Sequence, residues 1–419
     1  MSATFQPPSK SLTARDYQFI ALAVLVFIAI CYGLVRSNLT LKGGGDFYVH
    51  WVASRAFLFD NVDPYGAEVP NRVQKLVYEN GAQTGGEPYI FDTPFQLLQL
   101  YYPFALFTDP QLVRAIFTLL LELAFYLLIV LSLQLTDWEP PISYTVLFVF
   151  MAAFNFYTYQ AIREANPVLI LGLIYAGILF SIRADLDEVT GALMAFSLYY
   201  WEVGGPFLVL IVLRMYFEKR QRVLAGFFMA GFILVFISFL SYPNWIIPFL
   251  RATVNNLRAD FGHNLFTIFI YIFPEQGRTY ALVFTLLLMI ALGYEWSIAR
   301  GSEYRRFYWA ACLSLAAAPL LGFRTEMEHL AILIIPWALI LSIVYDRWRR
   351  FGGALVILLM LLLLIIPWTL QLFAVARWGA IVHEMIFIFL PLSTLVGLYW
   401  IRWWAIRPPR ILSDIANRL

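Results

Sequence analysis

Long apolar stretches recur along this chain, and charged residues stand mostly between them. A helix needs roughly 20 predominantly apolar residues to cross the hydrocarbon core of a bilayer. Breaks at proline, glycine and charged residues give twelve candidate stretches, some of them shorter than this: 17–35, 112–134, 142–160, 167–182, 188–201, 204–217, 223–247, 279–299, 306–322, 329–345, 351–372 and 383–402. We therefore predict an all-α integral membrane protein, a polytopic bundle of about twelve transmembrane helices (range 11–13) in one domain over residues 1–419.

Composition agrees with this class and excludes others. Hydrophobic residues make up 61% of the chain and charged residues 13%, which is typical of a multi-pass membrane protein. The net charge is +2 and no basic cluster forms a face for nucleic acid, so we expect no nucleic-acid partner. Cys31 and Cys312 both lie in apolar stretches, and we interpret them as core residues without a disulfide or metal role.

The basic residues predict the orientation of the helices. Lys and Arg gather in the short segments 214–222, 300–306, 347–350 and 402–410, which are expected to be cytoplasmic, as are both termini. These assignments agree only if the short apolar segment 94–107 does not cross the bilayer. We therefore expect 94–107 to be a re-entrant or short juxtamembrane helix on the outer side. The first outer loop is then 36–93, with juxtamembrane helices, and a second large outer loop is 248–278.

Two neighbouring stretches, 188–201 and 204–217, are short for a full crossing. The segment between them, Trp201-Glu202-Val203-Gly204-Gly205-Pro206, has the composition of a hinge. Irregular backbone at membrane depth occurs where protein or a water-filled cavity surrounds it. The pattern thus predicts a cavity that opens at the outer side beside this hinge.

Asp46 stands out in the first outer loop. It follows a glycine turn in Lys42-Gly43-Gly44-Gly45-Asp46, close to the end of the first apolar stretch. A carboxylate within the hydrocarbon costs roughly 2.5–3.5 kcal/mol on insertion scales, which favours a functional use for one held at the membrane edge. The alternative is that Asp46 caps a helix beginning at Phe47, since Gly-Asp is also an N-cap signal. Its position alone does not decide between the two.

Most other unusual polar residues fall on the same side of the membrane in this topology. Those we select as binding residues are His50, Arg163, Glu164, Asn166, Glu202, Arg258, His263, Asn264, Arg324 and His329. Arginine and histidine near the interface attract a lipid phosphate, so the set suggests an outward-facing site for an anionic, membrane-embedded substrate. Each signal also has a simpler interpretation: Arg163 and Glu164 could form a local ion pair, and Arg324 could pair with Glu328 four residues on.

Cofactor and metal sites have little support in the sequence. The chain has no Gly-x-x-x-x-Gly-Lys-Ser/Thr phosphate loop and no Cys/His spacing for zinc or haem. Asp60 and Asp63 have a spacing that could bind a divalent ion, but Asp63-Pro64-Tyr65 is also a good turn, and we favour the turn. We therefore predict no cofactor and no metal site.

Several short motifs, in this order and with this topology, resemble the polytopic GT-C glycosyltransferases, most closely glycosyltransferase family 87. They are Gly45-Asp46-Phe47-Tyr48, Asp63-Pro64-Tyr65, Thr93-Pro94 with Pro103, Asn166-Pro167, Gly205-Pro206, Gly262-His263-Asn264, and Ala318-Pro319 ahead of His329. The resemblance implies an inverting enzyme that moves a sugar (a mannose-like hexose or a pentose) from a polyprenyl-phosphate donor to a lipid-linked acceptor at the outer face. It implies that Asp46 is the general base, and we assign stabilisation of the leaving phosphate to Arg258, His263, Arg324 and His329.

The chain departs from that family at two places. The family has Gly-Gln-x-Asn where this chain has Arg163-Glu164-Ala165-Asn166, and a lysine ahead of the hinge proline where this chain has Trp201-Glu202. Losing a cation and gaining acids weakens phosphate binding unless Arg163 compensates. Two alternatives therefore stay open: a catalytically inactive structural subunit of a membrane complex, and a lipid or solute transporter. A transporter would be expected to show inverted repeats, and none is apparent.

Overall fold

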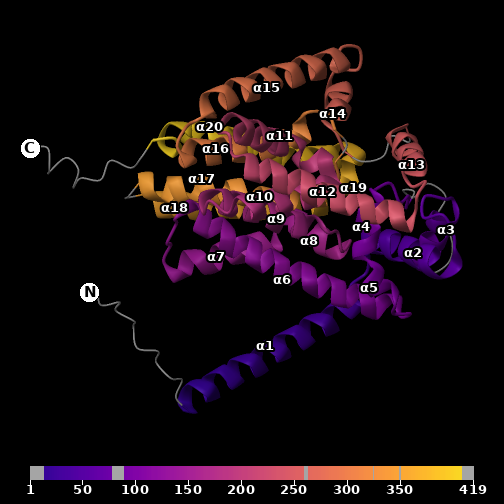
Figure 1. Ribbon diagram of the computed structural model, residues 1–419. Coiled ribbons are helices and arrows are strands. Elements are labelled where there is room, and N and C mark those ends of the chain that lie inside the picture. The colour runs from indigo at the N-terminus through magenta and orange to yellow at the C-terminus, as the bar shows by residue number, and fades with distance from the viewer. Residues whose placement is uncertain (1–13, 78–88, 259–262, 324, 349–350, 408–419) are drawn as a thin grey trace, which may run out of the picture.

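The computed structural model describes residues 14–77, 89–258, 263–323, 325–348 and 351–407, and regular structure in them is helical (Figure 1). The α-helices are α1 (Ala14–Thr40), α2 (Gly45–Asp60), α3 (Glu68–Val77), α4 (Phe95–Leu100), α5 (Tyr102–Ala105), α6 (Pro110–Thr136), α7 (Ile142–Phe154), α8 (Phe156–Arg163), α9 (Val168–Arg183), α10 (Asp187–Phe196), α11 (Trp201–Phe217), α12 (Gln221–Ser241), α13 (Ile246–Arg258), α14 (Leu265–Ile272), α15 (Gly277–Ala299), α16 (Tyr304–Ala317), α17 (Ile334–Arg347), α18 (Gly352–Thr369), α19 (Val375–Trp378) and α20 (Ala380–Ala405). Short 3-10 or π turns lie at Ser197–Tyr200, Ala318–Leu320, Glu328–Leu333 and Leu370–Ala374. The described residues contain one isolated antiparallel β-bridge, between His263 and Thr325.

Among the described residues, six helical segments are long and apolar enough to cross a membrane, or up to eight if each of two bent pairs is one span. The six are Pro110–Thr136, Gln221–Ser241, Gly277–Ala299, Glu328–Arg347, Gly352–Trp378 and Ile381–Ala405. The bent pairs are α1 with α2, at 91°, and α7 with α8, at 53°. The predicted class, a helical membrane protein, is confirmed.

The count of twelve crossings stays a prediction. All twelve apolar stretches contain helix, but several are shorter than a crossing needs. α10 has 10 residues, which at about 1.5 Å per residue is half the thickness of the hydrocarbon core. The hinge prediction is wrong by a few residues: the break falls at Ser197–Tyr200, and α11 begins at Trp201 and continues through Pro206. Glu202 therefore lies in the first turn of a helix rather than in a loop.

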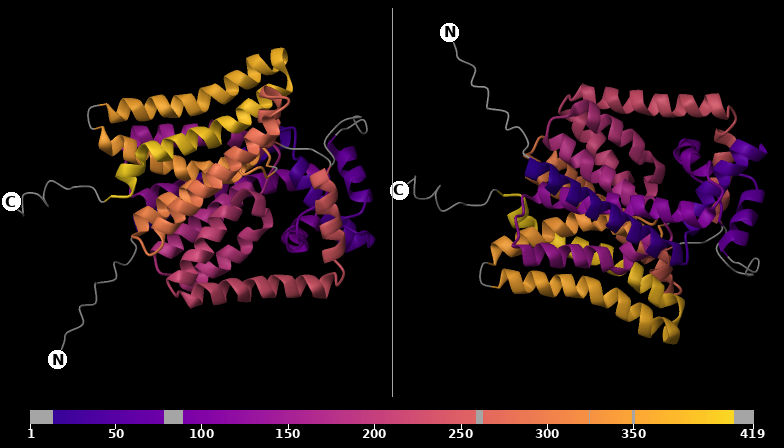
Figure 2. Two further views of the ribbon diagram at one scale, coloured as in Figure 1. Left: turned by 90° about the horizontal axis from the view of Figure 1, so that it is seen from above. Right: turned by 90° about the horizontal axis from the view of Figure 1, so that it is seen from below.

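The core of the bundle is formed around the segment Glu328–Arg347, in which 89% of the most apolar window is buried. This segment packs on α6, α16, α18 and α20. By contrast, only 17% of the window of α12 and 22% of the windows of α15 and Gly352–Trp378 are buried. α12 and α18 lie at opposite rims of the bundle (Figure 2), where a membrane protein presents apolar side chains to lipid.

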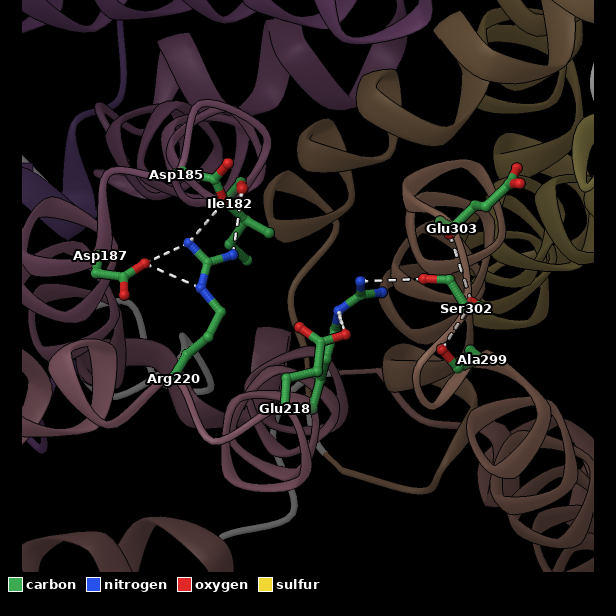
Figure 3. Close-up of polar contacts among 9 residues, drawn as sticks. Ile182, Asp185, Asp187, Glu218, Arg220, Ala299, Ser302 and Glu303 are labelled. Atoms are coloured by element: carbon green, nitrogen blue, oxygen red, sulfur yellow. Dashed lines mark hydrogen bonds and ion pairs between the residues drawn. The ribbon is translucent and has the colours of Figure 1, made fainter.

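The two ends of the bundle differ in their loops. α1 begins and α20 ends at the same end (left in Figure 1), together with short connections between helices. Arg220 pairs with Asp187 and with Asp185, and Arg214 pairs with Glu218 at 2.8 Å and donates to Ser302 O at 3.2 Å (Figure 3). These basic residues thus join the connections α9–α10, α11–α12 and α15–α16.

The opposite end, which we call the Asp46 end, carries the short helices α2 to α5 and α13 (Figure 1). α2 bends away from α1 by 91° and lies at this end of the bundle. The segment predicted as re-entrant or juxtamembrane, 94–107, contains α4 and α5, of 6 and 4 residues, each too short to cross. These helices are fixed to α2 by hydrogen bonds, from Trp51 Nε1 to Phe104 O at 3.0 Å and from Ser54 Oγ to Leu98 O at 3.2 Å.

Candidate functional site

The glycine turn before Asp46 sets the start of α2. Gly43 and Gly44 have φ of +116° and +94°, a region that favours glycine. A Cβ on Gly43 would lie 2.6 Å from the backbone oxygen of Arg163, at the end of α8. On the other side, Arg114 of α6 donates to Gly43 O at 3.3 Å and to Asn38 O at 2.7 Å. The turn is thus held between α6 and α8, which follow it by some 70 and 120 residues. This packing brings the first turn of α2 to residues 163–166.

We expect Gly43→Ala to lower the free energy of unfolding by about 1–3 kcal/mol. Alanine is disfavoured at this positive φ, and its Cβ would clash with the Arg163 carbonyl oxygen. Thermal unfolding in detergent micelles would measure this. Gly231→Ala is the matched control, since Gly231 lies inside α12 and a Cβ added there would meet nothing within 4 Å. The control should be neutral or stabilising by up to ~1 kcal/mol. Equal unfolding temperatures for parent and Gly43→Ala would contradict the close approach.

Asp46 lies in the first turn of α2 and accepts a hydrogen bond from Asn166. Asn166 is 1% exposed, and its Oδ1 accepts from the Val168 N–H at 2.8 Å. This orients the amide so that Nδ2 donates to Asp46 Oδ2, also at 2.8 Å. The N-cap of α2 is Gly44, without a side-chain cap. The simpler interpretation of Asp46 as a helix cap is therefore wrong, and its carboxylate faces other parts of the chain.

Two glutamates surround the Asp46 carboxylate together with Asn166. One carboxylate oxygen from each of Asp46, Glu326 and Glu328 lies within 4.8 Å of the others. A third glutamate, Glu164, accepts from the Gly45 N–H at 3.2 Å. Burial, and then the negative charges of Glu326 and Glu164, raise the pKa of Asp46 well above its ordinary value, against the lowering effect of the Asn166 hydrogen bond. A carboxylate with a raised pKa is a stronger base once it has lost its proton.

Three oxygen ligands at this spacing could also hold a hard divalent ion such as Mg²⁺, Mn²⁺ or Ca²⁺. The other pair considered from the sequence is used differently. Asp63 Oδ1 accepts from the Tyr65 N–H at 3.0 Å, as the predicted turn requires, and Asp60 pairs with Arg72.

His50 supports Asp46 from the next turn of α2. Its Nδ1 donates to the Asp46 backbone oxygen at 2.8 Å, its Nε2 lies 3.3 Å from Thr93 Oγ1, and its ring stacks on Tyr101 at 4.7 Å. Burial lowers the pKa of His50 to about 4, so the ring is neutral at neutral pH. His50 therefore orients the first turn of α2 and does not neutralise the carboxylate.

The His329 ring lies beside Asn166, the residue that donates to Asp46. The Glu326 backbone N–H donates to His329 Nδ1 at 3.3 Å, which places the single proton of the neutral ring on Nε2. Nε2 lies 3.4 Å from Asn166 Nδ2 and 3.9 Å from Glu326 Oε2. In this tautomer Asn166 Nδ2 and His329 Nε2 are both donors, so they do not hydrogen-bond to each other, and the Nε2–H is left to donate to a ligand oxygen. The edge of the ring meets Tyr200, with 5.4 Å between centroids.

Arg163 and Glu164 form the local ion pair considered from the sequence. Arg163 Nη2 lies 2.7 Å from Glu164 Oε1, and Nε donates to the same oxygen at 2.7 Å. The charge of Arg163 is therefore largely offset by its neighbour. Glu202 and Asp46 share a neighbour, because Tyr200 interacts electrostatically with both carboxylates.

The remaining predicted residues lie elsewhere or outside the description. His263 pairs with Glu384 of α20 at 2.9 Å and stacks on Phe387, and Asn264 caps α14 by accepting from the Thr267 N–H. Arg324 lies outside the described residues. Arg258 is the last residue of α13, and its side chain is not among those that the structure describes. His263 still affects the site indirectly, because its backbone bridge to Thr325 holds the segment that carries Glu326 and His329.

Sequence reasoning did not select Glu326, Glu328, Tyr101 and Tyr200. The run Glu326-Met327-Glu328-His329 was a usable signal, since it places two carboxylates beside a selected histidine at the start of an apolar stretch. The buried tyrosines carried no such signal. Folding brings the hydroxyls of Tyr101 and Tyr200 close enough to Asp46 for an electrostatic interaction with its carboxylate.

No protein-family model matches this chain, and no curated protein matches its sequence.

Proposed function

We propose that this membrane protein is an inverting glycosyltransferase that moves a sugar from a polyprenyl-phosphate donor to a hydroxyl of a lipid-linked acceptor at the outer face of the membrane. The observation that carries the proposal is the Asp46 carboxyl, oriented by Asn166 and raised in pKa, beside the His329 Nε2–H. Asn166 Nδ2 lies 2.8 Å from Asp46 Oδ2 and 3.4 Å from His329 Nε2, so a base and a hydrogen-bond donor flank one amide, an arrangement that suits the two ends of a displacement reaction.

In the proposed reaction the acceptor hydroxyl gives its proton to the ionised Asp46 carboxylate. The hydroxyl oxygen attacks the anomeric carbon of the donor sugar from the face opposite the phosphate, which inverts that centre. The bond between the anomeric carbon and the phosphate oxygen breaks, and the polyprenyl phosphate leaves with the electron pair. The His329 Nε2–H donates a hydrogen bond to the phosphate as its negative charge develops.

The predicted orientation of the helices supports a reaction at the outer face of the membrane. The α11–α12 connection, which carries Arg220, lies at the end of the bundle opposite α2 (Figure 1), and basic residues there fit a cytoplasmic face. Under this orientation both donor and acceptor reach Asp46 from the outer leaflet, and both carry an anionic or polar headgroup on a membrane anchor.

The direct test is transfer of labelled sugar by the purified protein. Polyprenyl-phosphate-linked hexoses and pentoses would be offered with mixed membrane lipids as acceptors, and the product would be analysed for inverted anomeric configuration. Transfer with inversion supports the proposal. Failure of every donor, with a competent control enzyme in the same assay, would overturn it.

Glu326→Gln tests the electrostatics of the base. Glu326 is the first of the charged groups that raise the pKa of Asp46, so removing its charge lowers that pKa. Because the base must be ionised, kcat/KM rises with pH through the pKa of Asp46, and the rising limb should move to lower pH in Glu326→Gln. Glu326→Asp keeps the charge and should leave the limb near its parent position. A limb at the same pH in parent and Glu326→Gln would mean that Asp46 is not the titrating base.

A second candidate, a catalytically inactive structural subunit, is favoured by one observation. Carboxylates gather around Asp46, and the nearby Arg163 is paired with Glu164, which disfavours a bound phosphate. This candidate predicts stable co-purification with another membrane protein from native membranes, with no transfer in the assay above. The glycosyltransferase proposal instead requires turnover by the isolated chain.

A further inference from the structure

A polar pocket lies at the Asp46 end, between α2 and α3. Its volume is about 320 Å³, and the side chains that define its character are Trp51, Arg55, Phe59, Asp60, Arg72 and Lys75. Residues four apart share one face of a helix, so Trp51, Arg55 and Phe59 form a single row along α2. At 100° per residue this row lies on the side of α2 away from Asp46 and His50. The pocket is therefore separate from the site described above.

The pocket carries positive charge that its own carboxylate does not balance. Arg72 pairs with Asp60 and with Glu68. Arg55 donates through Nη1 to two neutral acceptors, Ala105 O at 2.7 Å and Phe107 O at 2.9 Å, which hold the guanidinium without offsetting its charge. Lys75 is exposed, and within the described part of the chain neither it nor Arg55 forms an ion pair with a carboxylate. Two cations are thus left for an anionic ligand.

Aromatic and apolar groups surround these cations. The Arg55 guanidinium lies over the rings of Trp51, at 5.1 Å, and Phe59, at 5.4 Å. Phe59 is 54% exposed, and the adjoining Leu106 and Phe107 are 68% and 56% exposed. Since Arg55 bonds to the Phe107 carbonyl, the charged pocket and this apolar edge are continuous. Arginine, lysine and aromatic residues beside exposed apolar side chains are typical of a surface at the membrane interface.

We propose that this pocket binds the phosphate headgroup of an anionic membrane phospholipid. The phosphate lies between Arg55 and Lys75, and the acyl chains pass over Leu106 and Phe107. A soluble anion would use the two cations but gain nothing from the apolar edge. The bound lipid holds helices α2 and α3 against the membrane surface. This binding does not depend on the proposed sugar transfer.

Lipid preference in nanodiscs tests this inference. The full chain would be reconstituted in phosphatidylcholine with and without phosphatidylglycerol, and the lipid retained by the protein would be counted by native mass spectrometry, with the unfolding temperature as a second readout. The parent is expected to retain phosphatidylglycerol preferentially. Lys75→Gln should weaken that preference about fivefold, the effect of losing roughly 1 kcal/mol for one basic residue near an anionic surface.

Two controls separate the pocket from general charge effects. Arg251→Gln removes an exposed cation on α13 outside the pocket and should leave the preference unchanged. Arg55→Lys keeps the charge and should retain most of the preference, whereas Lys75→Gln does not. The proposal is overturned if Lys75→Gln and Arg251→Gln behave alike, or if inorganic phosphate alone in detergent stabilises the parent as much as phosphatidylglycerol does.

Discussion

Asp46→Asn is expected to lower kcat for sugar transfer by about 10²–10⁴-fold, the usual contribution of a positioned general base. The amide of asparagine can still accept the hydrogen bond from Asn166, so the geometry at this position is retained while the proton acceptor is lost. KM for the donor should change little, because the aspartate acts on the acceptor hydroxyl. A full kcat in Asp46→Asn would remove Asp46 from the mechanism.

The stability of Asp46→Asn distinguishes lost chemistry from lost folding. The folded state raises the pKa of Asp46 above its ordinary value of 3.8, so the folded protein holds this proton more tightly than the unfolded chain. The resulting stabilisation is fully present below pH 3.8 and is lost as the pH rises through the folded pKa. At neutral pH Asp46→Asn should therefore unfold at the same temperature as the parent or a higher one, with a difference that shrinks as the pH falls. A lower unfolding temperature would mean that the charge stabilises the fold.

His329→Ala is expected to lower kcat by about 10²–10³-fold, the effect of removing one donor to developing negative charge. His329 is 6% exposed, and its proton lies on Nε2 because Nδ1 accepts from the Glu326 N–H. His329→Gln offers an amide N–H in a similar volume and should recover part of the rate. The split between kcat and KM is the informative measurement, since a donor that acts on the leaving phosphate affects kcat more than donor binding.

Two outcomes would contradict this role for His329. If His329→Ala and His329→Gln lose the same activity, the histidine acts by packing against Tyr200 rather than as a donor. If both keep the parent kcat, another group stabilises the phosphate. Unfolding temperatures of the two variants would be compared first, so that a loss of folding is not scored as a loss of chemistry.

The positions of Asp46, Asn166 and His329 illustrate what could be predicted. Each was selected from the sequence as an unusual polar residue on the outer side of an apolar stretch. Folding brings all three together: Asn166 donates to Asp46, and His329 Nε2 lies 3.4 Å from the same amide nitrogen. His263 and Asn264 were selected by the same reasoning, yet they bind α20 and cap α14. The reasoning selected polar residues that the fold gathers at one end of the bundle, but it does not predict the partner of each one.

The sequence by itself determined that this is a helical membrane protein, because each apolar stretch must satisfy its own backbone hydrogen bonds in lipid, a local requirement. It also marked the glycine turn at Gly43, since a positive φ favours one residue type. The tertiary structure alone decided that Glu326 and Glu328 gather on Asp46, some 280 residues away in the chain. It likewise decided where helices bend and how far each extends. These features depend on packing between distant segments, and no local pattern of residues encodes that packing.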